Sequence, residues 1–137
     1  MNVNKNILLV DDDTVEHMKV SRAFKKLNIT NPLIHKEDGL KAKEYLESVD
    51  ELPGLILLDL NMPNMNGLEF LECVKADDRL KVIPIVVLTT SNNDKDRVAS
   101  YKHSVAGYMV KPIRLEEYER VIETIKQYWS TSKIAEN

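Results

Sequence analysis

Leu55-Ile56-Leu57-Leu58 is a continuous apolar run with Asp59 directly after it and Pro53-Gly54 directly before it. Unbroken apolar character is typical of a strand that is buried on both faces of a parallel sheet, because burial on one face would give alternation. Pro-Gly marks a turn before the run. We therefore expect a short central strand over Leu55–Leu58 with a carboxylate at its carboxyl end.

Similar apolar runs recur along the chain and alternate with segments of helical periodicity. The other expected strands are Ile7–Val10, Leu33–His35, Ile85–Leu88 and Val105–Val110. The expected helices are Val15–Leu27, Leu40–Val49, a helix that Gly67 opens, Lys95–His103 and Leu115–Trp129. Repeated strand–helix units with short connections predict an α/β fold, in which helices cover both faces of a five-stranded parallel sheet through right-handed crossovers.

Length, net charge and cysteine count limit the classes of protein to which this chain can belong. The chain has 137 residues, a formal net charge of −3 and one cysteine, Cys73. We expect one domain over residues 1–137, with its core at about 5–130 and a short polar tail after 130. Mixed charges give no basic surface for nucleic acid, and no apolar run approaches the roughly 20 residues that span a bilayer. A lone cysteine and a polar amino-terminal segment without a signal pattern predict a cytoplasmic protein.

Three aspartates follow two of the expected strands: Asp11 and Asp12 after the first, and Asp59 after the third. The carboxyl ends of parallel strands form one edge of the sheet, where ligands bind. Two unit charges about 4 Å apart repel by roughly 4 kcal/mol at an effective dielectric of about 20, so clustered carboxylates call for a proton or a cation. Oxygen ligands favour Mg²⁺, with Mn²⁺ as a substitute and the main-chain carbonyl of Asn61 as an additional ligand.

Two further residues at this edge suit a phosphoryl group. Thr89 follows the fourth strand and Lys111 follows the fifth. A carboxylate can attack phosphorus to form an acyl phosphate, and such transfer depends mainly on alignment and charge neutralisation. Asp59 ends the central run and is the expected nucleophile, while Lys111 would neutralise one phosphoryl oxygen and Thr89 would donate a hydrogen bond to another.

Each of these residues also has an ordinary structural interpretation. An aspartate run before a helix caps it, and we expect Asp13 to cap the first helix. Asp59 alone could cap the loop, Thr89 alone could be a structural residue, and Lys111 alone could be an ordinary surface lysine. Their joint placement at several strand ends favours a functional site.

Four stretches together resemble the receiver domain of two-component response regulators over nearly the whole chain. They are Leu9-Val10-Asp11-Asp12, Leu57–Pro63 with Gly67 following, Leu88-Thr89, and Tyr108-Met109-Val110-Lys111-Pro112. The resemblance implies a flavodoxin-like, doubly wound sheet with strand order 2-1-3-4-5 and five helices. It also implies that Asp59 accepts phosphate from a sensor histidine kinase, that Asp12 contacts the metal directly and Asp11 mainly through water, and that the Lys111–Pro112 bond is cis.

The resemblance further implies a switch. Thr89 would move toward the phosphate and Tyr108 would turn inward, rearranging the face built from the fourth helix, the fifth strand and the fifth helix. Two stretches, Ile83–Ser91 and Gln127–Thr131, resemble stand-alone receivers that serve phytochrome-type kinases, several of which pair through this face. The expected partners are thus a phytochrome-type histidine kinase, a second copy, and a downstream protein or phosphotransfer domain. The sequence leaves open whether the chain is an effector, a relay shuttle or a phosphate sink.

Thr90 departs from the family pattern, since many receivers have alanine or glycine there. Together with Asn61 and Ser91 it flanks the expected pocket, so these residues are expected to set the lifetime of the phosphorylated state. No segment remains for a DNA-binding output domain, and we expect no direct DNA binding.

An alternative is a Mg²⁺-dependent phosphatase like the haloacid-dehalogenase-like hydrolases, which also form an aspartyl phosphate. These enzymes usually have a second acid two residues after the nucleophile, where this chain has Asn61, and they have a cap insertion that this chain lacks. Another alternative is a receiver fold kept only as a binding scaffold, which the complete set of pocket residues disfavours.

Two other features are less informative. His17, His35 and His103 have no metal-ligand spacing, and we expect no function for them. The last helix has a broad apolar stripe, which predicts core packing and, at its margins, a partner or dimer surface. The stripe consists of Leu115, Tyr118, Val121, Ile122, Ile125, Tyr128 and Trp129.

Overall fold

A computed structural model describes residues 5–131, apart from the side chains of 125, 126 and 128–131. Strands and helices alternate from β1 to α5. The strands are β1 (Ile7–Val10), β2 (Leu33–Lys36), β3 (Leu55–Leu58), β4 (Ile85–Thr89) and β5 (Gly107–Val110). The helices are α1 (Thr14–Lys26), α2 (Gly39–Ser48), α3 (Gly67–Ala76), α4 (Asp94–Lys102) and α5 (Leu115–Thr131).

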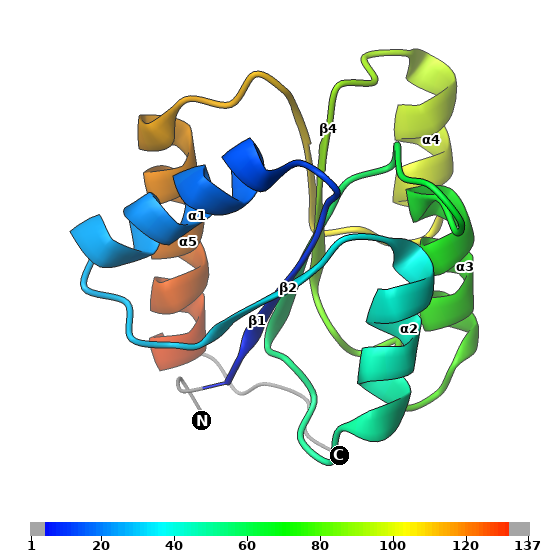
Figure 1. The fold of residues 1–137 in the computed structure, drawn as a ribbon, viewed down its shortest axis with the longest axis horizontal. Helices are drawn as coiled ribbons and strands as arrows, with labels where there is room; N and C mark the ends of the chain where they lie inside the picture. The colour runs from blue at the N-terminus through cyan, green and yellow to red at the C-terminus, as the bar shows by residue number, and fades with distance from the viewer. Residues whose placement is uncertain (1–4, 132–137) are drawn as a thin grey trace.

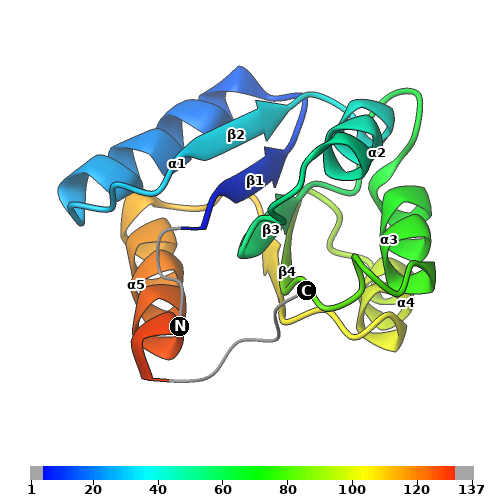
Figure 2. The ribbon, with the colours of Figure 1, turned by 90° about the horizontal axis from the view of Figure 1, so that it is seen from below.

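The five strands form one parallel sheet in the order β2-β1-β3-β4-β5, so β3 lies in the middle. Helices α1 and α5 lie side by side on one face, and α2, α3 and α4 lie on the other (Figures 1 and 2). The doubly wound, flavodoxin-like fold predicted from the sequence is confirmed, including its strand order.

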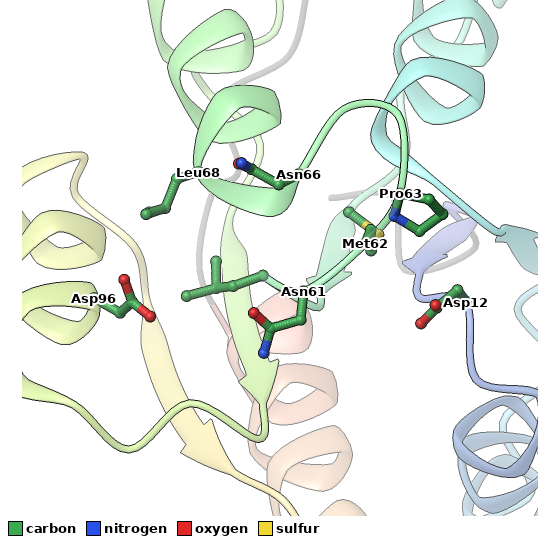
Figure 3. Close-up of a pocket in the computed structure, with 8 residues that line it drawn as sticks. Asp12, Asn61, Met62, Pro63, Asn66, Leu68 and Asp96 are labelled. Atoms are coloured by element: carbon green, nitrogen blue, oxygen red, sulfur yellow. The ribbon is translucent and has the colours of Figure 1, made fainter.

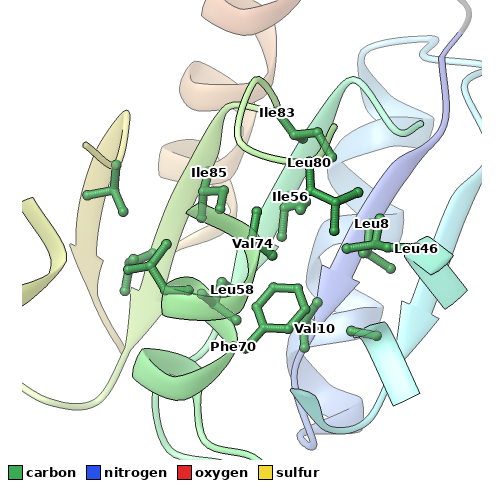
Figure 4. Close-up of a cluster of buried hydrophobic side chains, with 14 of the residues drawn as sticks. Leu8, Val10, Leu46, Ile56, Leu58, Phe70, Val74, Leu80, Ile83 and Ile85 are labelled. Carbon is green, nitrogen blue, oxygen red and sulfur yellow. The ribbon is translucent and has the colours of Figure 1, made fainter. Parts of the chain in front are cut away.

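Alternate strand residues enter two separate cores because successive side chains point to opposite faces of a sheet. Leu8, Ile56 and Ile85 face α2 and α3, where Phe70 and Val74 of α3 pack on them (Figure 4). We call this the α3-side core. The α5-side core lies on the other face and consists of Ile7, Leu9, Val20, Ala23, Phe24, Leu55, Leu57, Val86, Leu88, Ile113, Tyr118 and Ile122.

The sheet register brings the residues after the strands to one edge. Val10 pairs with Leu58, and Asp59 N donates to Val10 O at 2.9 Å, which continues the ladder past the strands. On the other side of β3, Lys111 N donates to Thr89 O at 2.7 Å. The polar residues that the sequence predicted at the strand ends therefore meet there.

A close approach at Gly67 holds the segment after β3. A Cβ atom at Gly67 would lie 2.4 Å from Asp59 O and 2.5 Å from Leu60 Cα, so only glycine fits without a shift of the main chain. Asn66 and Glu69 form a capping box at this end of α3, with each side chain accepting from the other residue's main-chain N–H. Asp13 caps α1 as predicted, since its side chain accepts from Val15 N.

The expected element bounds differ from the observed ones by two residues at the start of β5 and the end of α5, and by one residue at several other ends. β5 begins at Gly107, two residues later than the expected Val105, and β2 extends one residue further, to Lys36. In the apolar stripe of α5, Tyr118 and Ile122 are buried as expected. Ile125, Tyr128 and Trp129 lie outside the described side chains. None of the helices within residues 5–131 is long and apolar enough to cross a membrane.

Candidate functional site

Asp11, Asp12 and Asp59 form the only cluster of potential metal-binding side chains among the described residues. A carboxylate oxygen from each lies within 4.8 Å of the others. Asp11 and Asp59 are buried, whereas Asp12 is exposed. The β1–α1 and β3–α3 connections thus bring together the acids that the sequence placed at one edge.

Lys111 lies against the two buried acids. Its Nζ is 2.7 Å from Asp11 Oδ2 and 3.5 Å from Asp59 Oδ2. Burial alone would lower the pKa of the Lys111 ammonium, but the hydrogen bond and charge of Asp11, with the charge of Asp59, outweigh burial and raise this pKa above its usual value. The ammonium therefore stays protonated and balances part of the negative charge.

The buried acids hold their protons more tightly than ordinary aspartates. Burial raises the pKa of Asp11 to about 6, although the hydrogen bond from Lys111 opposes this change. Burial also raises the pKa of Asp59, while the charge of Lys111 lowers it and that of Asp12 raises it. Burial thus disfavours the charged form of both carboxylates, and a bound divalent cation would favour it.

Asn61 connects the acids to the end of β4. Its main-chain N–H donates to Asp59 Oδ1 at 3.2 Å. Its side-chain Nδ2 donates to Thr89 Oγ1 at 3.3 Å and to Thr90 Oγ1 at 3.1 Å. The sequence predicted Asn61 as a neighbour of the pocket but gave no sign of these bonds, because they join residues 28 and 29 positions apart.

Thr89 is completely buried, and its hydroxyl also accepts from Ser91 N at 3.2 Å. Ser91 in turn accepts at its main-chain carbonyl from the Tyr108 hydroxyl, at 2.9 Å. The ring of Tyr108 packs against the α3-side core, and burial raises the pKa of its hydroxyl. The residues that the switch hypothesis names are thus already joined through Ser91.

The site opens into a cavity of about 450 Å³. Figure 3 shows Asp12 and Asp96 on its opposite sides, with Asn61 between them and the start of α3 at its edge. The remaining lining residues are Leu60, Met62, Pro63, Asn66 and Leu68. The cavity shares Asp12 and Asn61 with the site, whereas the buried Asp11 and Asp59 do not line it.

A hydrogen bond between Asn64 and Asp38 connects the loop after β3 to the start of α2. Asp38 caps α2 by accepting from Lys41 N, and its other carboxylate oxygen accepts from Asn64 Nδ2, both at 2.8 Å. Asn64 has a φ of 64°, a left-handed conformation that asparagine tolerates better than most residues. The Lys111–Pro112 bond, directly after β5, is cis, the geometry that the family resemblance implied.

The donor set fits a hard divalent cation. Oxygen ligands from a few carboxylates, with room for water and phosphate oxygens, are what Mg²⁺ favours. Asp12 lines the cavity, and a single ammonium, Lys111 Nζ, contacts the two buried acids of this three-carboxylate cluster. No contact in the structure tests the main-chain carbonyl of Asn61 as a ligand, so that assignment stays a prediction.

In a comparison with known protein families, residues 7–123 match the response regulator receiver domain. The chain belongs to this family. Its members are signalling domains of two-component systems, so the receiver identity and the class of signalling predicted from the sequence are confirmed.

Individual relatives cover nearly the whole receiver. The probable methanogenesis regulatory protein FilR2 of Methanothrix harundinacea is 40% identical over 127 residues, which are 90% of this chain and 82% of FilR2. Response regulator Rcp1 of Synechocystis is 39% identical over 133 residues, which are 93% of this chain and 90% of Rcp1.

Solved structures agree with these relationships. The phosphorylated cyanobacterial phytochrome response regulator RcpA has a TM-score of 0.83 at 34% identity, covering 96% of this chain and 98% of RcpA. The Mn²⁺-bound form of Rcp1 has a TM-score of 0.81 at 37% identity, covering 96% of this chain and 99% of Rcp1. The predicted similarity to phytochrome response regulators is therefore confirmed.

Proposed function

We propose that this receiver acts as a stand-alone response regulator that accepts a phosphoryl group from a histidine kinase onto Asp59, in a reaction that needs a divalent cation. The observation that carries the proposal is the contact of one ammonium, Lys111 Nζ, with both buried acids of a three-carboxylate cluster. That arrangement suits a dianionic phosphoryl group because it supplies both a nucleophile and a positive charge in fixed positions.

In the proposed step, a carboxylate oxygen of Asp59 attacks phosphorus. A bond from Asp59 to phosphorus forms as the bond from phosphorus to the donor's imidazole nitrogen breaks, and the imidazole leaves with its electron pair. Asn61 N holds the other Asp59 oxygen, which fixes the direction of the carboxylate. A bound Mg²⁺, or Mn²⁺ in its place, would neutralise phosphoryl charge at Asp11, Asp12 and Asp59.

The proposed response to phosphorylation begins at Thr89. Its hydroxyl is held by Asn61 Nδ2 and by Ser91 N, and a phosphoryl oxygen on Asp59 would compete for it. A shift of Thr89 would move Ser91, whose carbonyl holds Tyr108. The face formed by α4, β5 and α5 would then favour a different packing, because the phosphoryl group contacts the two packings unequally.

The same face is the proposed site of pairing or partner binding. A cavity of about 430 Å³ lies there between α4, β5 and α5. It is lined by Val86, Tyr101, Ala106, Gly107, Tyr108, Met109, Arg120, Val121 and Thr124. Tyr101 and Val98 of α4 are about half exposed, at 51% and 52%. Proposed occupants are a second copy, a downstream protein or a phosphotransfer domain.

The phosphatase alternative finds less support. Such an enzyme needs an acid near Asp59 to protonate a leaving group and activate water. Asn61 stands at that position, and its amide is bonded to the Thr89 and Thr90 hydroxyls. Measurement of phosphomonoester turnover separates the two functions, and we expect none above the buffer rate.

The first test is the intact mass after incubation with acetyl phosphate and Mg²⁺. We expect the addition of one phosphoryl group, which disappears without Mg²⁺ and in Asp59→Asn. Asp13→Asn is the matched control, because it removes a neighbouring charge while keeping a side chain that caps α1 well. An unmodified wild-type protein that is folded and binds Mg²⁺ would contradict the proposal.

The kinase class needs its own test. RcpA is a cyanobacterial phytochrome response regulator, and its likeness to this receiver supports a phytochrome-type kinase as the donor. We expect faster phosphoryl transfer from an autophosphorylated phytochrome-type kinase than from a chemotaxis kinase, measured side by side with labelled ATP. Equal rates from both kinases would remove the support for a phytochrome partner.

A further inference from the structure

A buried carboxylate outside the acidic cluster lies between the two helices on one face of the sheet. Glu16 is in the first turn of α1, with only 4% of its surface exposed. Negative charge in a first helical turn is favourable even when it is exposed, so the helix dipole does not explain this burial. Burying a carboxylate is costly unless it is paired, so the partners of Glu16 must account for its place.

Glu16 contacts two other charged or polar groups from different parts of the chain. One of its oxygens accepts a hydrogen bond from the hydroxyl of Tyr118, a residue of α5 that is 1% exposed. The other lies 3.4 Å from Lys19 Nζ. Lys19 Nζ also donates to the main-chain carbonyl of Ile113 at 3.4 Å. Helix α1, the segment after β5 and helix α5 therefore meet around this one side chain.

The segment after β5 begins with Lys111, whose ammonium lies between Asp11 and Asp59. Ile113 is two residues further on, with its side chain 1% exposed in the α5-side core beside Tyr118. The segment is thus held from α5 by apolar packing and from α1 by Lys19. The charge of Glu16 is also among those that raise the pKa of Lys111.

We propose that Glu16 is a positioning residue for phosphoryl transfer, because it orients Lys19 and Tyr118 so that the Lys111–Arg114 segment holds the Lys111 ammonium against Asp11 and Asp59. The inference rests on the proposed function, since it assigns Glu16 to the phosphorylation of Asp59. Phosphoryl transfer depends on alignment, and a small displacement of Lys111 should slow it without unfolding the domain.

A matched control exists on the same two helices. Glu119 of α5 lies 3.1 Å from the ammonium of Lys26, the last residue of α1. Removing the Glu119 carboxylate also breaks an ion pair between α1 and α5, but at the end of α1 away from Lys19. The variants to compare are Glu16→Ala, Glu16→Gln, Tyr118→Phe and Glu119→Ala.

The experiment measures three quantities for each variant: the maximal phosphorylation rate at saturating acetyl phosphate with Mg²⁺, the Mg²⁺ affinity by calorimetry, and the urea midpoint. We expect Glu16→Ala to lower the maximal rate about tenfold, because the Lys111 ammonium is displaced from its aligned position. Mg²⁺ should bind to this variant as tightly as to the wild type or more tightly, because a displaced Lys111 no longer competes for Asp11. Glu16→Gln, which can still accept from Tyr118, should recover part of the rate. Tyr118→Phe should lose rate, and Glu119→Ala should keep the wild-type rate.

A lower rate together with an unchanged or higher Mg²⁺ affinity would separate positioning from general loosening. If Glu16→Ala changes the rate no more than Glu119→Ala, or loses rate and Mg²⁺ affinity together, the proposal is overturned and Glu16 serves packing alone. A wild-type protein that takes no phosphoryl group would overturn the proposed function and this inference with it. A phosphorylated wild type with an unaffected Glu16→Ala would overturn the inference alone.

Discussion

At the scale of single residues, the side chain of Asn61 joins the acids to the hydroxyls at the end of β4. One amide group donates to both Thr89 and Thr90. Thr89 is buried and belongs to the proposed switch, whereas Thr90 is exposed at the mouth of the pocket. The same amide therefore joins the residue that would sense the phosphoryl group to the one that we expect to limit access to it.

Thr90→Ala tests this coupling. The variant removes a β-branched side chain from the mouth and one acceptor of the Asn61 amide, so we expect both phosphorylation by acetyl phosphate and loss of the phosphoryl group to speed up about threefold to tenfold. The decay is followed by intact mass after the donor is removed. Thr30→Ala, at an exposed position before β2, is the control and should decay as the wild type does. A slower decay in Thr90→Ala would show that Thr90 helps hydrolysis instead of hindering it.

At the scale of elements, α3 packs directly on the main chain that presents Asp59. The contact is possible because Gly67 has no side chain, and Asn66 and Glu69 fix the first turn of the helix. Position 67 thus connects the start of α3 to the main chain of Asp59, the proposed nucleophile. A change there should alter chemistry and stability together.

Gly67→Ala should destabilise the domain by about 1–3 kcal/mol, because the added methyl group forces the main chain apart. We also expect slower phosphorylation of Asp59. Gly107→Ala in β5 is the matched control, since a Cβ there would meet only Val86 side-chain atoms at 3.6 and 3.8 Å, which is ordinary contact. Urea unfolding and the acetyl phosphate reaction measure both effects. Equal stability of the two variants would mean that the loop after β3 moves aside without cost.

Prediction from sequence succeeded where residues act through their position on a strand. Ile7–Val10 and Leu55–Leu58 were located correctly, and the parallel register then brought Asp11 and Asp59 together. Contacts that depend on side-chain direction across the fold were not predictable. The bond between Glu16 and Tyr118 spans 102 positions and depends on how α1 crosses α5.

The histidines give a second example of this limit. His17 and His35 have no informative spacing in the sequence, yet their rings stack with centroids 4.5 Å apart. His17 lies on α1 and His35 on β2, so only the packing of the helix on the sheet brings them together. His35 Nε2 also lies 2.6 Å from the main-chain oxygen of Asp11.

At the scale of the whole molecule, burying charged carboxylates in the pocket costs free energy of folding, which offsets part of the stabilisation from the two cores. Asp11 has a usual pKa of 3.8 that burial raises to about 6, so the folded chain holds a proton that the unfolded chain has released between these pH values. Folding stability contributed by Asp11 should therefore fall as the pH rises through this window. Asp38 acts in the opposite direction, because its hydrogen bond from Lys41 N lowers its pKa.

Comparison with Asp11→Asn isolates this contribution. In metal-free buffer, the stability of the wild type relative to Asp11→Asn should decline by about 1–3 kcal/mol from pH 4 to pH 7, after allowance for screening by solvent. Urea unfolding at several pH values measures the difference. Added Mg²⁺ should restore wild-type stability near pH 7. A relative stability that rises with pH would mean that Lys111 compensates the carboxylate fully.

The division of the interior into two cores also bears on how the chain folds while it is being made. The α3-side core draws mainly on β1, β3, β4, α2 and α3, which precede α4 in the chain, and only Val105 and Tyr108 join it from later residues. The α5-side core joins Val20 and Phe24 of α1 to Tyr118 and Ile122 of α5. During synthesis on the ribosome, most of the α3-side core can form early, while the other face, covered only by α1, stays partly exposed until α5 emerges. That partly exposed face is where a chaperone would bind the nascent protein.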